Sequence, residues 1–526
     1  MSAFTDDSLI VHTTAGAVRG ARDGKTNRWL GVPYAAPPVG PLRLRSPQAP
    51  VPWEGVRDAL HLGPAAPQEP TKVIPLPPGV TIDEDCLELN IWVPERVEED
   101  HKPRPVMVWV HGGAYFIGFS AQPIYNGRSL AENGDVIVVT LNYRLGALGF
   151  LDFTSLSTPE VTFESNLGLR DVMQALSWVQ ENIAAFGGDP NDVTLFGESA
   201  GGGVVTTLMT VPSAHGLFQK AIAQSSPATS VYGKERARGV ALAYLKLLGV
   251  SEADAPTALH ELDAVKMASV TTELLNHVAL TAPGTVAFAP VIDGELIVDY
   301  PVKIFREGKA ARIPLIIGTN HDEAALFKMM KSPLMPISYE AVNKMFALVG
   351  EDNPKLAGIE PGVTAAYPEY PKQKGSMAIS RDAGFLMPSI WVAEAHSRYA
   401  PTWMYRFDQA PPLMKLLGIG ASHGTEIPYA WGTLPNKLSE RNGVLFRLGG
   451  LKLALKISRR MQARWLSMAV SGDPQTTHPD TGAELVWPRY DEALRATLII
   501  NAVDTIENDP DSKIRKAWGE RVLGFK

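Results

Sequence analysis

The amino-acid sequence predicts an α/β fold, with a mostly parallel central sheet flanked by helices. Two features of the 526-residue chain point to it. Short apolar runs rich in β-branched residues recur along the chain, and segments with a helical pattern separate them. Apolar runs of this kind are typical of strands buried on both faces, and parallel strands need crossovers between them. The candidate strands are 106–110, 136–143, 193–197, 221–226, 314–320, 402–407 and 498–501.

The segments between and before these runs have patterns of their own. Residues 169–186 carry an apolar stripe at the spacing of an amphipathic helix. Residues 9–22 alternate around a glycine, which predicts an antiparallel hairpin at a sheet edge. Residues 64–79 are rich in proline and predict an irregular surface loop.

The chain shows no sign of two independent domains. It contains no internal repeat, no charged tail and no linker. We therefore expect residues 1–526 to form a single domain, as large α/β enzymes with insertions do. Two long stretches with helical patterns, at about 228–284 and 328–400, are expected to form a cap over the sheet.

Composition excludes several classes of protein. With 45% hydrophobic and 20% charged residues, the chain has the composition of a soluble globular protein. The formal net charge of −7 leaves no basic surface for nucleic acid. No stretch approaches the ~18 apolar residues of a membrane span, and the N-terminus lacks a cationic, apolar leader. These features predict a cytoplasmic protein.

Cysteine usage agrees with a reducing compartment. Cys86 is the single cysteine, so the chain cannot form an internal disulfide. We interpret Cys86 as a small buried hydrophobe. The sequence shows no cluster that could hold structural zinc, and no metal site is expected.

Residues 197–201 read GESAG and follow a candidate strand. In a G-x-S-x-G turn between a strand and a helix, the serine occupies a strained backbone conformation, and the glycines avoid collisions with neighbouring elements. This arrangement would expose the hydroxyl of Ser199 at the tip of the sheet. The alternative is an ordinary flexible glycine-rich turn, because the short pattern also occurs by chance.

The sequence just after another candidate strand favours the catalytic interpretation. Residues 110–118 read VHGGAYFIG. A glycine pair after a strand allows backbone amides to turn inward, as an oxyanion hole requires. The two motifs therefore support each other.

Motifs along nearly the full length carry a resemblance to a known family. The chain resembles the type-B carboxylesterases, which include bacterial para-nitrobenzyl esterases and the cholinesterases, and this implies an α/β-hydrolase fold. The motifs lie at 31–44, 84–94, 111–115, 142–151, 182–190, 197–202, 288–294, 318–324, 422–429 and 463–474. One departure concerns Cys86. Secreted members pair the equivalent cysteine with one upstream, and Ala66 stands where that partner would be expected.

A serine nucleophile needs a base to take its proton and an acid to orient that base. His423 lies in a glycine-rich loop after a late strand, where the chain order serine, acid, histidine places the base. The resemblance implies the same residue. His111 is better interpreted as a structural hydrogen-bonding group of the oxyanion loop. An imidazole with an ordinary pKa of ~6.5 predicts that activity rises between about pH 6 and 7.5.

The segment GTNHDEA at 318–324 offers two acids, Asp322 and Glu323, and either could orient the base by its chemistry. The resemblance favours Glu323 and leaves Asp322 as a structural, loop-capping acid. It also implies that Glu198 is a buried group behind the site, whereas the alternative is a turn residue that faces solvent. Ser225 is expected to support Glu323 by a hydrogen bond.

Together these residues predict a serine carboxylesterase that hydrolyses uncharged esters through an acyl-enzyme. The amides of Gly113, Ala114 and Ala200 would hold the oxyanion. No metal or organic cofactor is implied, and a monomer or small homo-oligomer is expected. The alternatives are an amidase or carbamate hydrolase with the same triad, and a non-catalytic cholinesterase-like interaction protein. The presence of all three triad residues argues against the last.

The resemblance also suggests how the acyl pocket differs from that of acetylcholinesterases. Gly284 and Val286 stand where those enzymes carry phenylalanines, so we expect a more open acyl pocket. The segment at 73–83, which supplies their choline-stacking tryptophan, contains no aromatic residue here. It would therefore offer a quaternary ammonium no cation–π partner.

Overall fold

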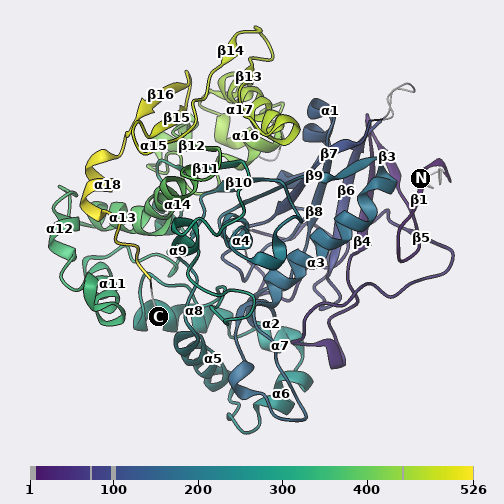
Figure 1. Cartoon of the computed structure of the whole chain (residues 1–526), viewed down its shortest axis with the longest axis horizontal. Coiled ribbons are helices and arrows are strands. Elements are labelled where there is room, and N and C mark those ends of the chain that lie inside the picture. Colours follow the sequence, from purple (N-terminus) through teal and green to yellow (C-terminus); the bar gives the residue numbers. More distant parts are fainter. Residues whose placement is uncertain (1–6, 72–73, 96–101, 441–442, 525–526) are drawn as a thin grey trace.

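A computed structural model describes residues 7–71, 74–95, 102–440 and 443–524 (Figure 1). Within these ranges, eleven strands form one sheet in the order β16-β15-β12-β11-β10-β9-β7-β8-β6-β4-β3. Its strands are β3 (Ala21–Asp23), β4 (Thr26–Pro33), β6 (Glu88–Pro94), β7 (Arg104–Val110), β8 (Ile137–Leu141), β9 (Gly188–Glu198), β10 (Lys220–Gln224), β11 (Leu315–Asn320), β12 (Thr402–Phe407), β15 (Ala496–Ile500) and β16 (Thr505–Asn508).

The centre of the sheet is parallel and its two ends are antiparallel. The strands from β8 through β7, β9, β10, β11 and β12 to β15 all run parallel. Each of them overlaps one of the candidate strands, so the prediction of a parallel core is confirmed. The end strands escaped prediction because they lack a continuous apolar run. For example, all four residues of β16 are exposed, and polar residues interrupt β6.

Alternate side chains of β7 enter two separate cores, one on each face of the sheet. Val106, Val108 and Val110 belong to the core on the side of α3 and α4. Met107 and Trp109 belong to the core on the side of α1, α16 and α17. These helices are α1 (Arg128–Gly134), α3 (Leu167–Asn182), α4 (Ala200–Leu208), α16 (Ile427–Trp431) and α17 (Leu451–Ser471). The predicted helix at 169–186 thus forms as α3 and a following 3-10 turn.

The hairpin predicted at 9–22 differs in its position. Strands β1 (Ile10–His12) and β2 (Ala17–Arg19) pair as expected, but they join β5 (Val56–Asp58) in a separate three-stranded sheet of the described chain. The edge of the large sheet is instead the antiparallel pair of β3 and β4. A further small pair is formed by β13 (Thr476–Thr477) and β14 (Glu484–Leu485).

The proline-rich loop at 64–79 is irregular, but part of it is not at the surface. Ala65 and Ala66 are buried, and Ala65 forms a bridge with Ile82. The buried side chain of Gln68 donates to the carbonyl of Gly118 and accepts from its amide, at 2.9 and 3.0 Å. The expectation of a surface loop is therefore wrong for this part, because it fastens the loop that follows β7.

Both stretches predicted to carry helices do so. The first holds α5 (Lys234–Leu248), α6 (Ala255–Glu261), α7 (Ala264–Ala268) and α8 (Thr271–Thr281), together at the bottom of Figure 1. The second holds α11 (Tyr339–Asp352), α12 (Glu360–Thr364), α13 (Gln373–Arg381), a π-helical turn (Asp382–Leu386) and α14 (Met387–Ser397). Of these, α14 packs on β11 and β12 and so covers the sheet itself.

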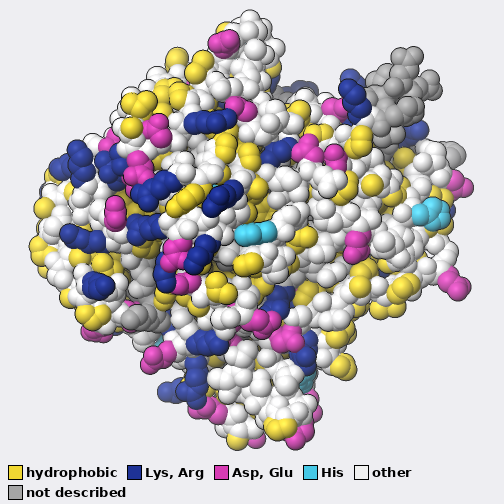
Figure 2. Space-filling model, viewed as in Figure 1, with side chains coloured by type: hydrophobic (Ala, Val, Ile, Leu, Met, Phe, Trp, Pro, Cys, Tyr) yellow, Lys and Arg dark blue, Asp and Glu magenta, His cyan; other side chains and the backbone are white. Residues whose placement is uncertain are grey.

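The remaining helices are α2 (Gly146–Phe150), α9 (Pro301–Arg306), α10 (Ala324–Met329), α15 (Pro412–Leu416) and α18 (Ser512–Trp518). Among the described helices, none is long and apolar enough to cross a membrane. Figure 2 shows cationic and anionic side chains interspersed over the viewed face, with no continuous basic stripe there.

A buried ion pair ties the segment after β8 to α3. The guanidinium of Arg144 donates to both carboxylate oxygens of Asp171, at 2.8 and 2.6 Å, and the amide of Arg144 also donates to this carboxylate. Both side chains are at most 3% exposed. Loss of the acid would leave a buried guanidinium without a counter-charge.

We expect Asp171→Ala to lower the free energy of unfolding by about 3–5 kcal/mol, measured by urea denaturation. Asp480→Ala provides the control, because Asp480 pairs with Arg459 at the surface, where both side chains are more than 40% exposed. That change is expected to cost less than about 1 kcal/mol. Equal losses in the two variants would contradict the role given to the buried pair.

Candidate active site

The turn between β9 and α4 holds Ser199 in a strained conformation, with φ 58° and ψ −124°. The flanking glycines allow neighbouring backbones to approach closely. A Cβ atom on Gly201 would lie 2.0 Å from the carbonyl oxygen of Val110, and one on Gly197 would lie 2.6 Å from the carbonyl carbon of Gly201. The steric reason that the sequence suggested for these glycines is thus present in the fold.

His423 and Glu323 lie in line with Ser199. Nε2 of His423 is 2.8 Å from Oγ of Ser199, and Nδ1 is 2.6 Å from Oε2 of Glu323. An ionised carboxylate can only accept, so Nδ1–H donates to Glu323, and in the neutral imidazole Nε2 accepts from the serine hydroxyl. The other oxygen of Glu323 accepts from the hydroxyl of Ser225 at 2.6 Å and from the amide of Asn320 at 2.7 Å. The predicted contact between Ser225 and Glu323 is therefore present.

Asp322 points away from this group. Its carboxylate accepts from the amide of Ala421 at 3.0 Å, and its amide donates to the carbonyl of Ala421 at 2.9 Å. Its other oxygen contacts Nδ1 of His321 at 2.9 Å. These bonds fasten the start of the loop that carries His423, in agreement with the loop-capping role expected for Asp322.

The loop after β7 lies directly against the serine turn. A Cβ atom on Gly112 would be 3.0 Å from Cβ of Ser199. Gly113 has a φ of +117°, and a Cβ there would be 1.9 Å from the carbonyl oxygen of Ile117, so only glycine fits. Within the described chain, the amides of Gly113, Ala114 and Ala200 donate to no protein acceptor, and all three residues line the same cavity as Ser199.

His111 serves as a structural part of this loop. Burial lowers its pKa to about 4, so the ring stays neutral. Its Nδ1 lies 2.8 Å from the carbonyl of Gly112, and its ring stacks on Tyr143 at 4.5 Å. The hydroxyl of Tyr143 donates to the carbonyl of His111 at 2.7 Å. These contacts of His111 and Tyr143 hold the loop after β7 in place.

Comparisons with known proteins agree with this geometry. The sequence profile of the carboxylesterase family matches residues 7–518. The chain belongs to the carboxylesterase family. It is 37% identical to the para-nitrobenzyl esterase of Bacillus subtilis (strain 168), over 96% of this chain and 98% of that protein. It is 34% identical to the fumonisin B1 esterase of Sphingopyxis macrogoltabida, over 93% of this chain and 86% of that protein.

Solved structures of relatives have the same fold. A PNB esterase structure superposes with a TM-score of 0.84 at 37% identity, and the match covers 97% of this chain and 99% of that one. The α/β-hydrolase fold implied by the sequence is thus confirmed, and the chain is a serine hydrolase that acts on carboxylic esters.

Three buried carboxylates surround His423 in this carboxylesterase. Oε1 of Glu198 lies 3.3 Å from Nε2 of His423 and has no hydrogen-bond partner among the described residues. Glu426, fully buried, accepts from the side-chain amides of Gln224 at 2.9 Å and Asn320 at 2.5 Å. Glu323 is the third. The interpretation of Glu198 as buried behind the site agrees with its 4% exposure.

These carboxylates alter the titration of His423. Burial raises the pKa of Glu198 to about 8. Burial acts to lower the pKa of His423, but the charges of Glu198, Glu323 and Glu426 outweigh it and raise the pKa to about 9. The expectation of an ordinary imidazole is therefore wrong. A general base must be neutral to accept a proton, so the predicted role of His423 would place the acidic limb of activity at higher pH.

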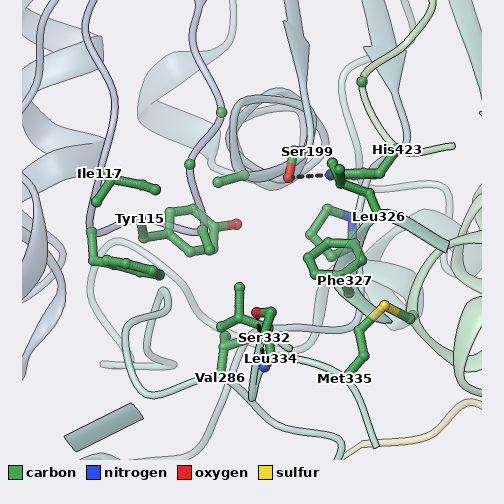
Figure 3. A pocket seen from close by; sticks show the side chains of 18 of the residues that line it. Tyr115, Ile117, Ser199, Val286, Leu326, Phe327, Ser332, Leu334, Met335 and His423 are labelled. Carbon is green, nitrogen blue, oxygen red and sulfur yellow. Dashed lines mark hydrogen bonds between the residues drawn. The ribbon is translucent and has the colours of Figure 1, made fainter. Parts of the chain in front are cut away.

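A cavity of about 840 Å³ opens below Ser199 and His423. In Figure 3, Tyr115 and Ile117 lie on one side, while Leu326, Phe327 and Met335 lie on the side of His423. Val286, Ser332 and Leu334 face Ser199 from the opposite end. The wall is therefore mostly apolar, and cap segments supply much of it.

Both predicted acyl-pocket residues line this cavity, but one of them leaves less room than expected. Gly284 has a φ of +87°, and a Cβ there would lie 2.6 Å from Cγ and 2.7 Å from Sδ of Met345. Met345 comes from α11, is 1% exposed and lines the cavity. The space that a side chain at 284 would occupy is thus filled from another element.

Sequence reasoning also missed the aromatic rings that hold His423. Phe385, in the π-helical turn, lies 4.6 Å from the imidazole, and Phe327 lies 5.2 Å from it, between ring centroids. Nothing in the local sequence links either residue to the site. Glu426, in contrast, stands in the quoted motif at 422–429 and could have been identified from it.

We expect kcat/KM to rise with pH with a midpoint above 6.5, and Glu198→Gln to lower this midpoint, because removal of the neighbouring negative charge lowers the pKa of His423. A pH series of initial rates measures both. Glu95→Gln, which removes an exposed carboxylate paired with Arg22, should leave the midpoint in place. A midpoint in Glu198→Gln equal to or above that of the unmodified protein would contradict the electrostatic coupling.

Proposed function

We propose that the protein hydrolyses uncharged carboxylic esters with Ser199 as nucleophile, His423 as general base and Glu323 as the acid that orients it. The continuous line of hydrogen bonds from Ser199 through His423 to Glu323, at 2.8 and 2.6 Å, is the observation that supports this most. Residues 1–526 act as a single domain in this proposal, with the insertions at about 228–284 and 328–400 shaping the pocket.

The reaction proceeds in two halves. His423 takes the proton of Ser199 while Oγ attacks the carbonyl carbon of the ester, and the imidazolium then protonates the departing alcohol. Water next attacks the acyl-enzyme, with His423 again as base, and releases the acid and the free serine. Glu323 stays ionised throughout and stabilises the imidazolium.

The oxyanion is bound by the amides of Gly113, Ala114 and Ala200. Gly113 and Ala114 have positive φ values of +117° and +50°, in keeping with a loop whose backbone turns its amides toward the cavity. Ala200 is the first residue of α4, so its amide has no partner within the helix. The helix dipole adds to the attraction for negative charge.

The position of the proton donor divides the cavity into a side for the alcohol part and a side for the acyl part of the ester. The departing alcohol must receive its proton from Nε2 of His423, so the alcohol part lies on the side of Phe327 and Met335 (Figure 3). The acyl part then extends away from His423, toward Val286 and Met345. Besides His423, the described residues that line the cavity include two with charged side chains, Glu198 and Lys331. Lys331 is exposed. An uncharged ester suits this lining.

We further propose a cytoplasmic location. Cys86 is fully buried, and burial raises the pKa of its thiol well above its usual range. A chain without a disulfide is suited to a reducing compartment.

We expect Ser199→Ala to lower ester hydrolysis by at least ~10³-fold, because binding and the oxyanion amides alone retain little catalysis. Initial rates on a para-nitrophenyl ester measure the loss, and circular dichroism checks the fold. Ser332→Ala is the matched control, since Ser332 lines the same cavity at the end away from Ser199. Near-normal turnover in a folded Ser199→Ala protein would exclude the proposed nucleophile.

Two methionines test the two sides of the cavity. The best acyl chains are expected to have roughly four to eight carbons. Met345→Ala is expected to lengthen the preferred acyl chain by roughly two carbons, because it shortens the side chain in front of Gly284. Met335→Ala should instead change the preference among alcohol parts. A series of para-nitrophenyl esters and a series of butyrate esters separate the effects.

If the two variants changed acyl and alcohol preference in the same way, the division of the cavity would be contradicted. Acetylthiocholine belongs in the same assay, with weak activity expected. The corresponding anilides measure amide hydrolysis, and a kcat/KM on anilides above that on esters would overturn the ester preference.

A further inference from the structure

Six large aliphatic side chains are exposed in the stretch that runs from the end of α15 to the start of α17. They are Leu416, Leu417, Leu438, Val444, Leu445 and Leu448, with exposed fractions of 74, 62, 52, 43, 37 and 55%. We call this set the leucine patch. Contiguous apolar surface of this kind marks an interaction site more often than scattered single residues do.

The segments that carry the leucine patch pack on one another. Helix α15 packs on the 3-10 turn Gly443–Phe446. A Cβ on Gly450 would lie 2.9 Å from Cδ of Pro412, and a Cβ on Gly443 would lie 2.3 Å from the carbonyl oxygen of Leu438. The segments that carry the patch therefore lie against one another.

The inward positions of these segments are already taken by other residues. Met414 in α15 and Phe446 in the 3-10 turn are buried, at 8 and 2% exposed. Their neighbours Leu416, Leu417 and Leu445 consequently point outward. The exposure of the patch thus follows from how the segments pack, since one side of each is already used in the core.

Exposed cations accompany these leucines along the chain. Lys415, Lys437 and Arg447 alternate with them, and Lys452 and Lys456 follow in α17. None of them belongs to an ion pair with another described residue. Glu440 is the described acid in the same stretch, and its carboxylate accepts from the amide of Asn436. In a chain of net charge −7, this concentration of cations beside apolar surface stands out.

We propose that the leucine patch docks on the surface of an anionic lipid bilayer. Aliphatic side chains can enter the headgroup region while the flanking cations contact the lipid phosphates and carboxylates. A protein partner fits less well, because the exposed patch has no tryptophan or tyrosine, the residues that with arginine dominate such interfaces, and leucine is under-represented among them. A second copy of the chain would bring like charges together.

The position of the leucine patch connects it to the catalytic side of the molecule. Leu416 and Leu417 precede the loop that carries His423. Thr433, on the way to Leu438, donates through its hydroxyl to the carbonyl of Ile124 at 3.1 Å, and Ile124 lines the cavity. Docking here would hold the enzyme at a surface where uncharged esters collect. The docking itself does not depend on the proposed ester hydrolysis.

Sedimentation with lipid vesicles tests the proposal. The full-length protein should bind vesicles of phosphatidylcholine with about 30% phosphatidylglycerol, and about 0.5 M salt should weaken the binding. Leu416→Ser with Leu417→Ser, and separately Lys415→Glu with Lys437→Glu, should each lower the bound fraction about fivefold or more. Val503→Ser and Leu280→Ser are the controls, since these residues are 76 and 74% exposed outside the patch. Hydrolysis of a water-soluble ester checks the fold of every variant.

Several results would overturn the proposal. The first is that the protein binds neither vesicles with phosphatidylglycerol nor vesicles of phosphatidylcholine alone. The second is that it binds both kinds equally well and that the charge-reversed variant still binds. A third is a concentration-dependent dimer, seen by light scattering, that the leucine variants dissolve without any vesicle binding. That outcome would assign the patch to a second copy of the chain. If the control substitutions lower the bound fraction as much as the patch substitutions do, the leucine patch is not the docking surface.

Discussion

The close contact between the loop after β7 and the turn after β9 is the constraint on which the catalytic geometry depends. Only residues without side chains permit it. A Cβ on Gly201 would collide with the carbonyl of Val110, and one on Gly112 would press on Ser199. Because the two segments touch through their backbones, the hydroxyl of Ser199 and the inward amides face the same cavity. The parallel strands supply the rigid edge that keeps these loops in register.

The charge distribution around His423 depends on this packing in turn. Glu198 is only 4% exposed, and its carboxylate lies 3.3 Å from Nε2 of the imidazole. Glu323 is fixed by Ser225 and Asn320, whereas Glu426 is held by amides. A site with this much buried negative charge stabilises a positive imidazolium as it forms. The same charge raises the pH at which His423 becomes neutral.

The helical insertions contribute to the site in a different way. They supply apolar wall and rings, and they come from positions far away in sequence. Met345 fills the space in front of Gly284, and Phe385 packs on His423 from a π-helical turn. π-helical turns are rare and are often found at functional sites. Variation in these segments can change the wall of the cavity without disturbing the strands that precede Ser199, Glu323 and His423.

The sequence by itself determined the parallel core, the serine turn and the candidate base. Continuous apolar runs and flanking glycines are local signals, and the chain order of the motifs can be read from the sequence directly. One open question needed distances. Asp322 and Glu323 are chemically equivalent neighbours. In the fold, Glu323 points toward His423, while the carboxylate of Asp322 accepts from the amide of Ala421. The tertiary structure alone decided the pocket wall and the exposure of the leucine patch. Both arise where segments distant in sequence compete for the same space, and no local pattern records which side chain occupies it.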